Sequence, residues 1–179
     1  MMNFEQSQLS GSPHHFFAQL VGGWTGTTKL WLEPDVLADE SPVLGTITLV
    51  LEGRFAIYLY QGSIEGEQQQ GMFTFGYNTT TDQYEASWVD SFHNNTAIMF
   101  CVGHATENGF SVLGSFPDPT GGPDWGWRTE VELPCRLIGV APGPGNSWMV
   151  YALGSNYVGD GTRVDEYKTQ LYHITAPKG

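Results

Sequence analysis

Apolar and polar residues alternate along most of this chain with a period of two, the pattern of half-buried β-strands. The alternation is cleanest over residues 125–133, where Trp127 and Val131 share one face and Arg128 and Glu130 the other. The pattern predicts about ten strands, over residues 24–33, 44–51, 54–61, 71–77, 83–92, 96–104, 110–116, 125–133, 147–153 and 163–174. Segments rich in Gly, Pro, Asn and Asp separate these strands, so consecutive hairpins are expected.

One short helix is predicted near the N-terminus, over residues 13–20. Ser12 is a suitable N-cap and Pro13 fits the first helical position, whereas Gly22 and Gly23 end the helical pattern. Residues 1–12 carry no periodic pattern of their own, and we expect a flexible N-terminal tail there.

Short strands joined by hairpins favour an antiparallel up-and-down sheet. A sheet of about ten strands normally curls closed, and closure removes its exposed edges. A β-sandwich is the alternative, but sandwiches usually need long crossover connections. No linker or internal repeat divides the sequence, so we predict an all-β fold in which residues 1–179 form a single β-barrel domain.

Charge narrows the set of partners. The chain carries 19 Asp+Glu against 7 Lys+Arg, a formal net charge of -12. That charge repels phosphate backbones and anionic lipid surfaces, so we expect neither nucleic-acid nor membrane binding. The sequence shows no secretory leader and no apolar run long enough to span a bilayer. A cytoplasmic location is therefore expected, with Cys101 and Cys135 reduced.

A set of motifs in the first two thirds of the chain resembles a known family. The motifs are Pro13-His14-His15, Leu20-Val21-Gly22-Gly23-Trp24-Thr25-Gly26, Trp31-Leu32-Glu33-Pro34, Gly53-Arg54-Phe55, Phe75-Gly76-Tyr77-Asn78-Thr79 and Trp88-Val89-Asp90-Ser91. A helix followed by Gly-x-Trp is similar to the entry of calycins, the superfamily of lipocalins and fatty-acid-binding proteins. The whole series resembles the bacterial domain of unknown function 1579, which is grouped with the calycins.

The resemblance implies a calycin-like barrel and no reaction type, because the family has no established activity. It covers most of the chain and weakens after His104. Near its end the family tends to show Glu-x-x-Tyr, whereas Thr169 stands three residues before Tyr172 here. No role of that glutamate is carried over to this chain.

Asp90 is the most informative candidate site residue. Strand parity places it beside Trp88 on an aromatic, inward face, where a carboxylate needs a cation or several hydrogen-bond donors. Arg54 shares the parity of Tyr58 and Tyr60, so we hypothesise an Asp90–Arg54 pair inside the barrel. Three roles remain open for Asp90: a cap of backbone amides at the barrel rim, a polar anchor for a ligand, or a catalytic acid or base.

An aromatic interior with a few polar groups is typical of a small-ligand pocket. The predicted ligand-binding residues are Arg54, Trp88, Asp90, Trp127, Tyr167 and His173. We expect a binding protein for a small apolar or amphipathic ligand. The alternative is a cofactor-independent enzyme, an isomerase, lyase or hydrolase, that uses Asp90 or His173 as acid or base. An interior filled by side chains would exclude both.

Cofactors and oligomeric state are less constrained by the sequence. No cofactor-binding motif is present, and the spacing of the histidines predicts no metal site. Tyr172 and Trp148, expected on outward strand faces, are compatible with a homodimer.

Overall fold

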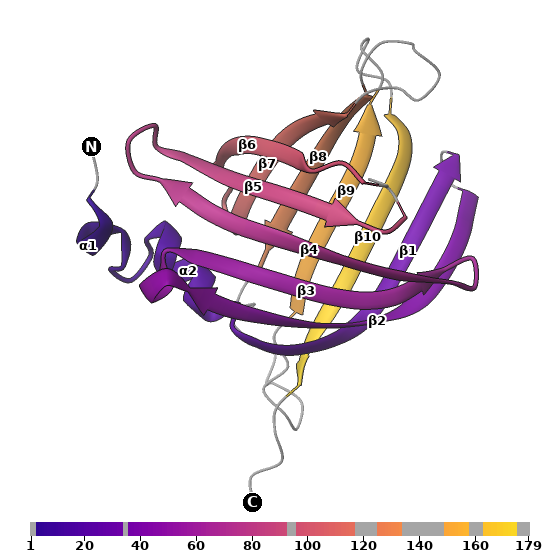
Figure 1. Ribbon diagram of the computed structural model, residues 1–179, viewed down its shortest axis with the longest axis horizontal. Helices are drawn as coiled ribbons and strands as arrows, with labels where there is room; N and C mark the ends of the chain where they lie inside the picture. The colour runs from indigo at the N-terminus through magenta and orange to yellow at the C-terminus, as the bar shows by residue number, and fades with distance from the viewer. Residues whose placement is uncertain are drawn as a thin grey trace, which may run out of the picture.

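Consecutive strands pair antiparallel, and the first strand pairs with the last. The computed structural model describes residues 3–33, 36–92, 96–116, 125–133, 149–157 and 163–174. Within these residues ten strands close into a barrel in the order β1-β10-β9-β8-β7-β6-β5-β4-β3-β2 (Figure 1). The strands are β1 (Gly22–Glu33), β2 (Val36–Val50), β3 (Phe55–Ile64), β4 (Glu67–Asn78), β5 (Gln83–Asp90), β6 (Met99–Ala105), β7 (Gly109–Phe116), β8 (Trp125–Glu132), β9 (Met149–Tyr157) and β10 (Arg163–Ile174). The predicted up-and-down barrel is confirmed.

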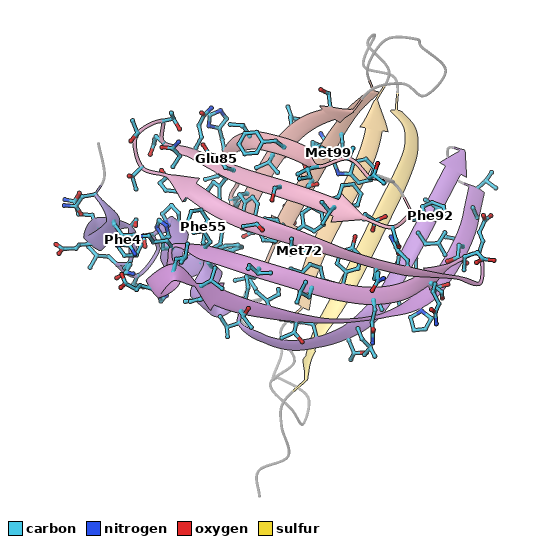
Figure 2. All side chains as sticks on the ribbon, in the orientation of Figure 1. Phe4, Phe55, Met72, Glu85, Phe92 and Met99 are labelled. Atoms are coloured by element: carbon cyan, nitrogen blue, oxygen red, sulfur yellow. The ribbon has the colours of Figure 1, made fainter. Side chains whose placement is uncertain are left out.

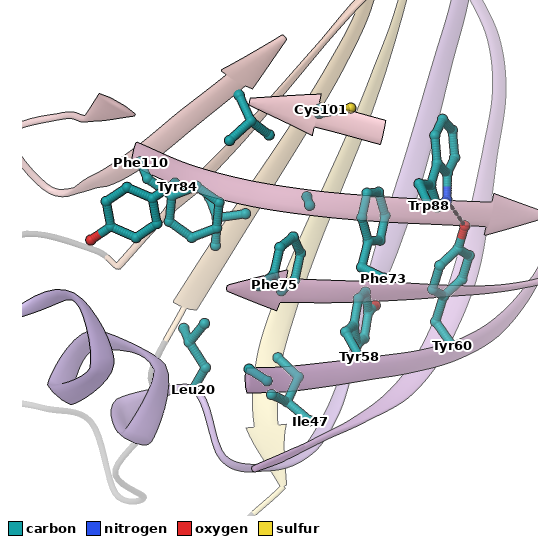
Figure 3. Packing of buried hydrophobic residues seen from close by; sticks show 14 of the residues in the cluster. Leu20, Ile47, Tyr58, Tyr60, Phe73, Phe75, Tyr84, Trp88, Cys101 and Phe110 are labelled. Carbon is teal, nitrogen blue, oxygen red and sulfur yellow. Dashed lines mark hydrogen bonds between the residues drawn. The ribbon is translucent and has the colours of Figure 1, made fainter. Parts of the chain in front are cut away.

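Aromatic rings line the part of the interior that the described side chains form. Trp24, Trp88 and Trp127 are the largest fully buried side chains. The Trp88 ring stacks on Phe73 with centroids 5.1 Å apart (Figure 3). Its centroid lies 4.7 Å from that of Trp127. The inward faces predicted for β5 and β8 are confirmed, because Trp88 and Trp127 are both buried and Val131 lies with them in the core.

The N-terminal helix α2 (Pro13–Gln19) closes one end of this core. Phe17 and Leu20 are fully buried, and the Phe17 ring meets Tyr84 and Phe110 edge-on. The Trp24 indole N–H donates to the Leu20 carbonyl at 2.8 Å, which ties the helix end to β1. Among the described residues, neither helix combines the length and hydropathy that crossing a membrane requires.

The expectation of a flexible tail over residues 1–12 is corrected for residues 3–12. A second helix, α1 (Phe4–Ser7), begins with a capping box in which Asn3 and Gln6 bond each other's backbone amides. The ring of Phe4, which Figure 2 labels on α1, packs edge-on against His14 at 5.0 Å. The Arg54 guanidinium lies 4.5 Å from the centre of the same ring. These contacts hold α1 against α2 and against the start of β3.

The break predicted at Glu52-Gly53 is a 3₁₀ turn, η1 (Leu51–Gly53), between β2 and β3. Leu51, Glu52 and Gly53 all have positive φ, at 51°, 61° and 87°. This left-handed stretch ends the β2 ladder, and the chain re-enters the sheet at Phe55 with its predicted parity intact.

The register of the β5–β6 hairpin differs by two residues from the register that the turn residues Asn94-Asn95 predict. A turn centred on Asn94-Asn95 would place Trp88 opposite Cys101, but Trp88 pairs with Met99 and Ala86 with Cys101. A shift of two keeps every side chain on its predicted face. Cys101 is therefore buried as expected, and burial raises the pKa of its thiol to about 11.

His14 gives the N-terminal end of the barrel a predicted pH dependence. Its buried imidazole packs among Phe4, Phe17 and Tyr77, and burial lowers its pKa below 6.5. The unfolded chain then binds more protons, so stability should fall as pH drops below about 6.5. The free energy of unfolding, measured with urea at pH 7 and at pH 5, should fall less between these pH values in His14→Phe than in the wild type.

His15→Phe, altered at the next position of α2, is the control for this measurement and should keep the wild-type pH dependence. An unchanged pH dependence in His14→Phe would contradict the assignment of this effect to His14.

Candidate functional site

Four side chains form a hydrogen-bonded cluster where β5 ends. We call Tyr60, Gln69, Trp88 and Asp90 the Asp90 cluster. The Asp90 carboxylate is 4% exposed. Its Oδ2 accepts from the Tyr60 hydroxyl and from Gln69 Nε2 at 2.9 Å, and its Oδ1 accepts from the Phe92 backbone N–H at 2.8 Å. The Trp88 indole N–H donates to the Tyr60 hydroxyl oxygen at 2.9 Å (Figure 3).

Strand register explains how Tyr60 reaches Asp90 across β4. Tyr60 pairs with Gly71, and Gly71 pairs with Asp90, so the three residues form one row across β3, β4 and β5. A Cβ at Gly71 would overlap the Tyr60 hydroxyl and lie 2.8 Å from its Cε1. Gly71 therefore leaves space for the Tyr60 ring to lie over β4 on the inner face of the sheet and reach Asp90.

Stacked aromatic rings lead from the Asp90 cluster into the barrel. Tyr60 stacks on Tyr58 at 5.1 Å and on Phe73 at 6.4 Å, and Phe73 stacks in turn on Phe75 at 5.2 Å. The only carboxylate among the described buried residues thus lies at the end of an apolar wall. Such an end can bind a polar group of a molecule whose remainder is apolar.

The cluster lies at the end of the barrel away from the helices. Figure 2 shows Phe92, just beyond β5, and Phe4 of α1 on opposite sides of the molecule. The Phe92 N–H bond to Asp90 is the rim-capping contact that the sequence suggested. Phe92 has the strand parity of Trp88 and Asp90, which predicts an inward side chain, but it is 44% exposed because β5 ends at Asp90.

The hypothesis of an Asp90–Arg54 pair is wrong. Arg54 follows η1 and lies beside the Phe55–Gly76 pair, whereas Asp90 pairs with Gly71. Residues 71 and 76 are five positions apart on β4, about 16 Å at about 3.3 Å per residue, which is beyond the reach of an arginine. Arg54 instead bonds the Glu52 carboxylate at 2.7 Å at the surface of the molecule.

The other predicted site residues fall on the opposite wall of the barrel. Trp127 is buried against Trp88, and its indole N–H donates to Thr129 Oγ1 at 2.9 Å. Tyr167 pairs with Leu30 and His173 with Trp24 in the β1–β10 register. The side chains of Tyr167, His173, Tyr172 and Trp148 lie outside the described residues.

Gln69 was missed because the predicted strand began at Gly71. The strand in fact begins at Glu67, and Gln69 continues the inward alternation of Gly71, Phe73 and Phe75. Extending the period-two pattern by one step toward the N-terminus would have found it.

A groove of about 790 Å³ crosses the outer face of β1–β5 behind the Asp90 cluster. Exposed Leu59 and half-buried Val89 form one wall, and exposed Gln61 and Gln70 form the other. Tyr60 and Asp90 contribute backbone to its floor, because their side chains point inward. Over the described part of the chain, no three His, Cys, Asp or Glu residues gather closely enough to hold a metal ion.

Comparisons with known proteins give one family and a distant structural likeness. The family model described as "Protein of unknown function (DUF1579)" matches residues 10–135. A solved structure of an S-type phycobiliprotein lyase from Guillardia theta has 13% sequence identity and a TM-score of 0.45, over 97% of this chain and 99% of that chain. The comparison with curated proteins gives no match.

Proposed function

We propose that this chain, which belongs to the DUF1579 family of unknown function, binds a small apolar or amphipathic molecule inside the barrel. The proposed ligand carries a hydroxyl or N–H group, which the Asp90 cluster binds. Its apolar part lies against the aromatic wall formed by Tyr60, Phe73 and Trp88.

The observation that carries this proposal is the set of acceptors at the end of the aromatic wall. Gln69 is buried and donates its amide N–H to Asp90, so its carbonyl oxygen is a further acceptor beside the carboxylate. Because Asp90 and the Gln69 carbonyl are both acceptors, the cluster favours ligands that donate a hydrogen bond.

The bonding of Asp90 favours an anchor over a catalytic base. Both carboxylate oxygens accept hydrogen bonds, from Tyr60, Gln69 and the Phe92 backbone. These three donors fix the orientation of the carboxylate and occupy three of its roughly four lone-pair positions, which suits an anchor that accepts one further hydrogen bond from a ligand.

A pair of probes that differ in one donor tests the proposal. 1-Naphthol has a hydroxyl, and 1-methoxynaphthalene has the same rings without a donor. Calorimetric titration should give a roughly tenfold lower Kd for 1-naphthol, since a hydrogen bond to a charged acceptor contributes about 1.5 kcal/mol. In Asp90→Asn and in Gln69→Met the ratio of the two Kd values should approach one.

Asp82→Asn is the matched control, because Asp82 also accepts from a tyrosine, Tyr77, but does so at an exposed turn. This variant should keep the wild-type preference for 1-naphthol. Near-ultraviolet circular dichroism establishes that each variant remains folded. Equal affinities of the wild type for the two probes, or a preference that survives both cluster variants, would overturn the proposal.

A further inference from the structure

Exposed apolar side chains gather on the outer face of two neighbouring strands, β6 and β7. Phe100 is 57% exposed and Leu113 is 61% exposed. Val102 pairs with Leu113 across the two strands, and Ile98, 72% exposed, lies two residues before Phe100. We call Ile98, Phe100, Val102 and Leu113 the β6–β7 face. Contiguous exposed apolar side chains of this kind mark interaction surfaces.

Opposite charges flank this face on a single row of the sheet. Glu85 of β5 pairs with Val102, Val102 pairs with Leu113, and Leu113 pairs with Arg128 of β8. Strands lie about 4.8 Å apart, so Glu85 and Arg128 stand about 7 Å to either side of the centre of the row. Within the chain, Arg128 also pairs with Glu130 at 3.3 Å, and Glu85 accepts a hydrogen bond from Asn78 at 2.8 Å. Figure 2 labels Glu85 on β5, beside β6.

We propose that a second copy of this chain covers the β6–β7 face and forms a twofold-symmetric dimer. The twofold axis lies in the interface, parallel to the strands and between β6 and β7. Rotation about this axis places Glu85 against Arg128 of the partner subunit, and Arg128 against Glu85 of the partner subunit. Val102 and Leu113 of both copies then form the apolar centre.

The charge pattern selects this axis over the alternative. An axis in the same plane but across the strands would place Glu85 against Glu85 of the partner subunit, which is repulsive. A chain of net charge -12 repels its own copies, so an interface must offset that repulsion locally. A face with an apolar centre, a carboxylate on one side and a guanidinium on the other is complementary to itself, as an isologous interface requires. The five N–H donors of an arginine allow Arg128 to bond Glu85 of the partner subunit as well as its own Glu130.

A charge-exchange experiment tests the dimer by sedimentation equilibrium. Glu85→Arg and Arg128→Glu should each weaken dimerisation at least tenfold, because each places like charges in contact twice. The double variant Glu85→Arg/Arg128→Glu should recover much of the wild-type affinity, because it exchanges the partners and keeps their complementarity.

An apolar variant and its control complete the test. Leu113→Ser should give a monomer with an almost unchanged urea midpoint, since Leu113 is exposed in the single chain. Leu51→Ser, equally exposed but outside the β6–β7 face, should remain a dimer. A wild-type protein that stays monomeric, or a dimer insensitive to both Leu113→Ser and the single charge reversals, would overturn the proposal.

Discussion

Replacing Trp88 with alanine is expected to lower the free energy of unfolding by about 3–5 kcal/mol. The indole stacks on Phe73 and Trp127, and its N–H donates to the Tyr60 hydroxyl. Its removal leaves a cavity between two walls of the barrel and deprives Tyr60 of a buried donor. Urea unfolding followed by circular dichroism measures the loss.

Leu59→Ala is the control for this prediction, because Leu59 lies in the same sheet but is exposed on its outer face. This variant should lose less than about 1 kcal/mol. A loss in Trp88→Ala no larger than that in Leu59→Ala would show that the stacked rings do not form the stabilising core.

The second large effect is expected from Gly103→Val on β6. A Cβ at Gly103 would overlap the Ser111 carbonyl oxygen and lie 2.7 Å from the Val112 Cα, both in the backbone of β7. Backbone in a paired strand cannot move aside as a flexible side chain can. We expect a loss of about 3 kcal/mol or more, or failure to fold, measured by urea unfolding.

Gly66→Ala separates crowding from backbone strain. Gly66 has a φ of 83° in the β3–β4 turn, and a Cβ there would have nothing within 4 Å. Alanine at this position should cost about 1–2 kcal/mol, from its left-handed backbone alone. A Gly103→Val variant that loses no more stability than Gly66→Ala would contradict the close approach of β6 and β7.

Local pattern predicted most of the fold, because the alternation of apolar residues records which face of each strand is buried. Two elements escaped it for physical reasons. Helix α1 is too short to show periodicity, and its only signal is the capping pair of Asn3 and Gln6. The first half of β2 contains Pro42, which argues against a central strand. Residues 36–42 pair only with β1, since pairing with β3 starts at Val43, so one side of Pro42 needs no donor.

The pattern predicted that Asp90 points inward but not which residues bond its carboxylate. Parity placed Asp90 inside and required partners for it, and the structure supplies neutral donors from Tyr60 and Gln69. Strand parity shows which face a residue lies on but not how far along the strand it lies. It therefore could not show that Arg54 is too far from Asp90 to pair with it. The register between β5 and β6 depends on the length of the loop that joins them. The alternation of buried and exposed residues does not reveal a register shift of two residues.

The structure of the complex with 1-naphthol would show whether the molecule binds inside the barrel. We expect the naphthol ring against Tyr60 and Trp88, with its hydroxyl within about 3 Å of Gln69 Oε1 or an Asp90 carboxylate oxygen. Naphthol bound only in the groove on the outer face of the sheet, or an Asp90 cluster that remains empty at saturating naphthol, would contradict binding in the interior.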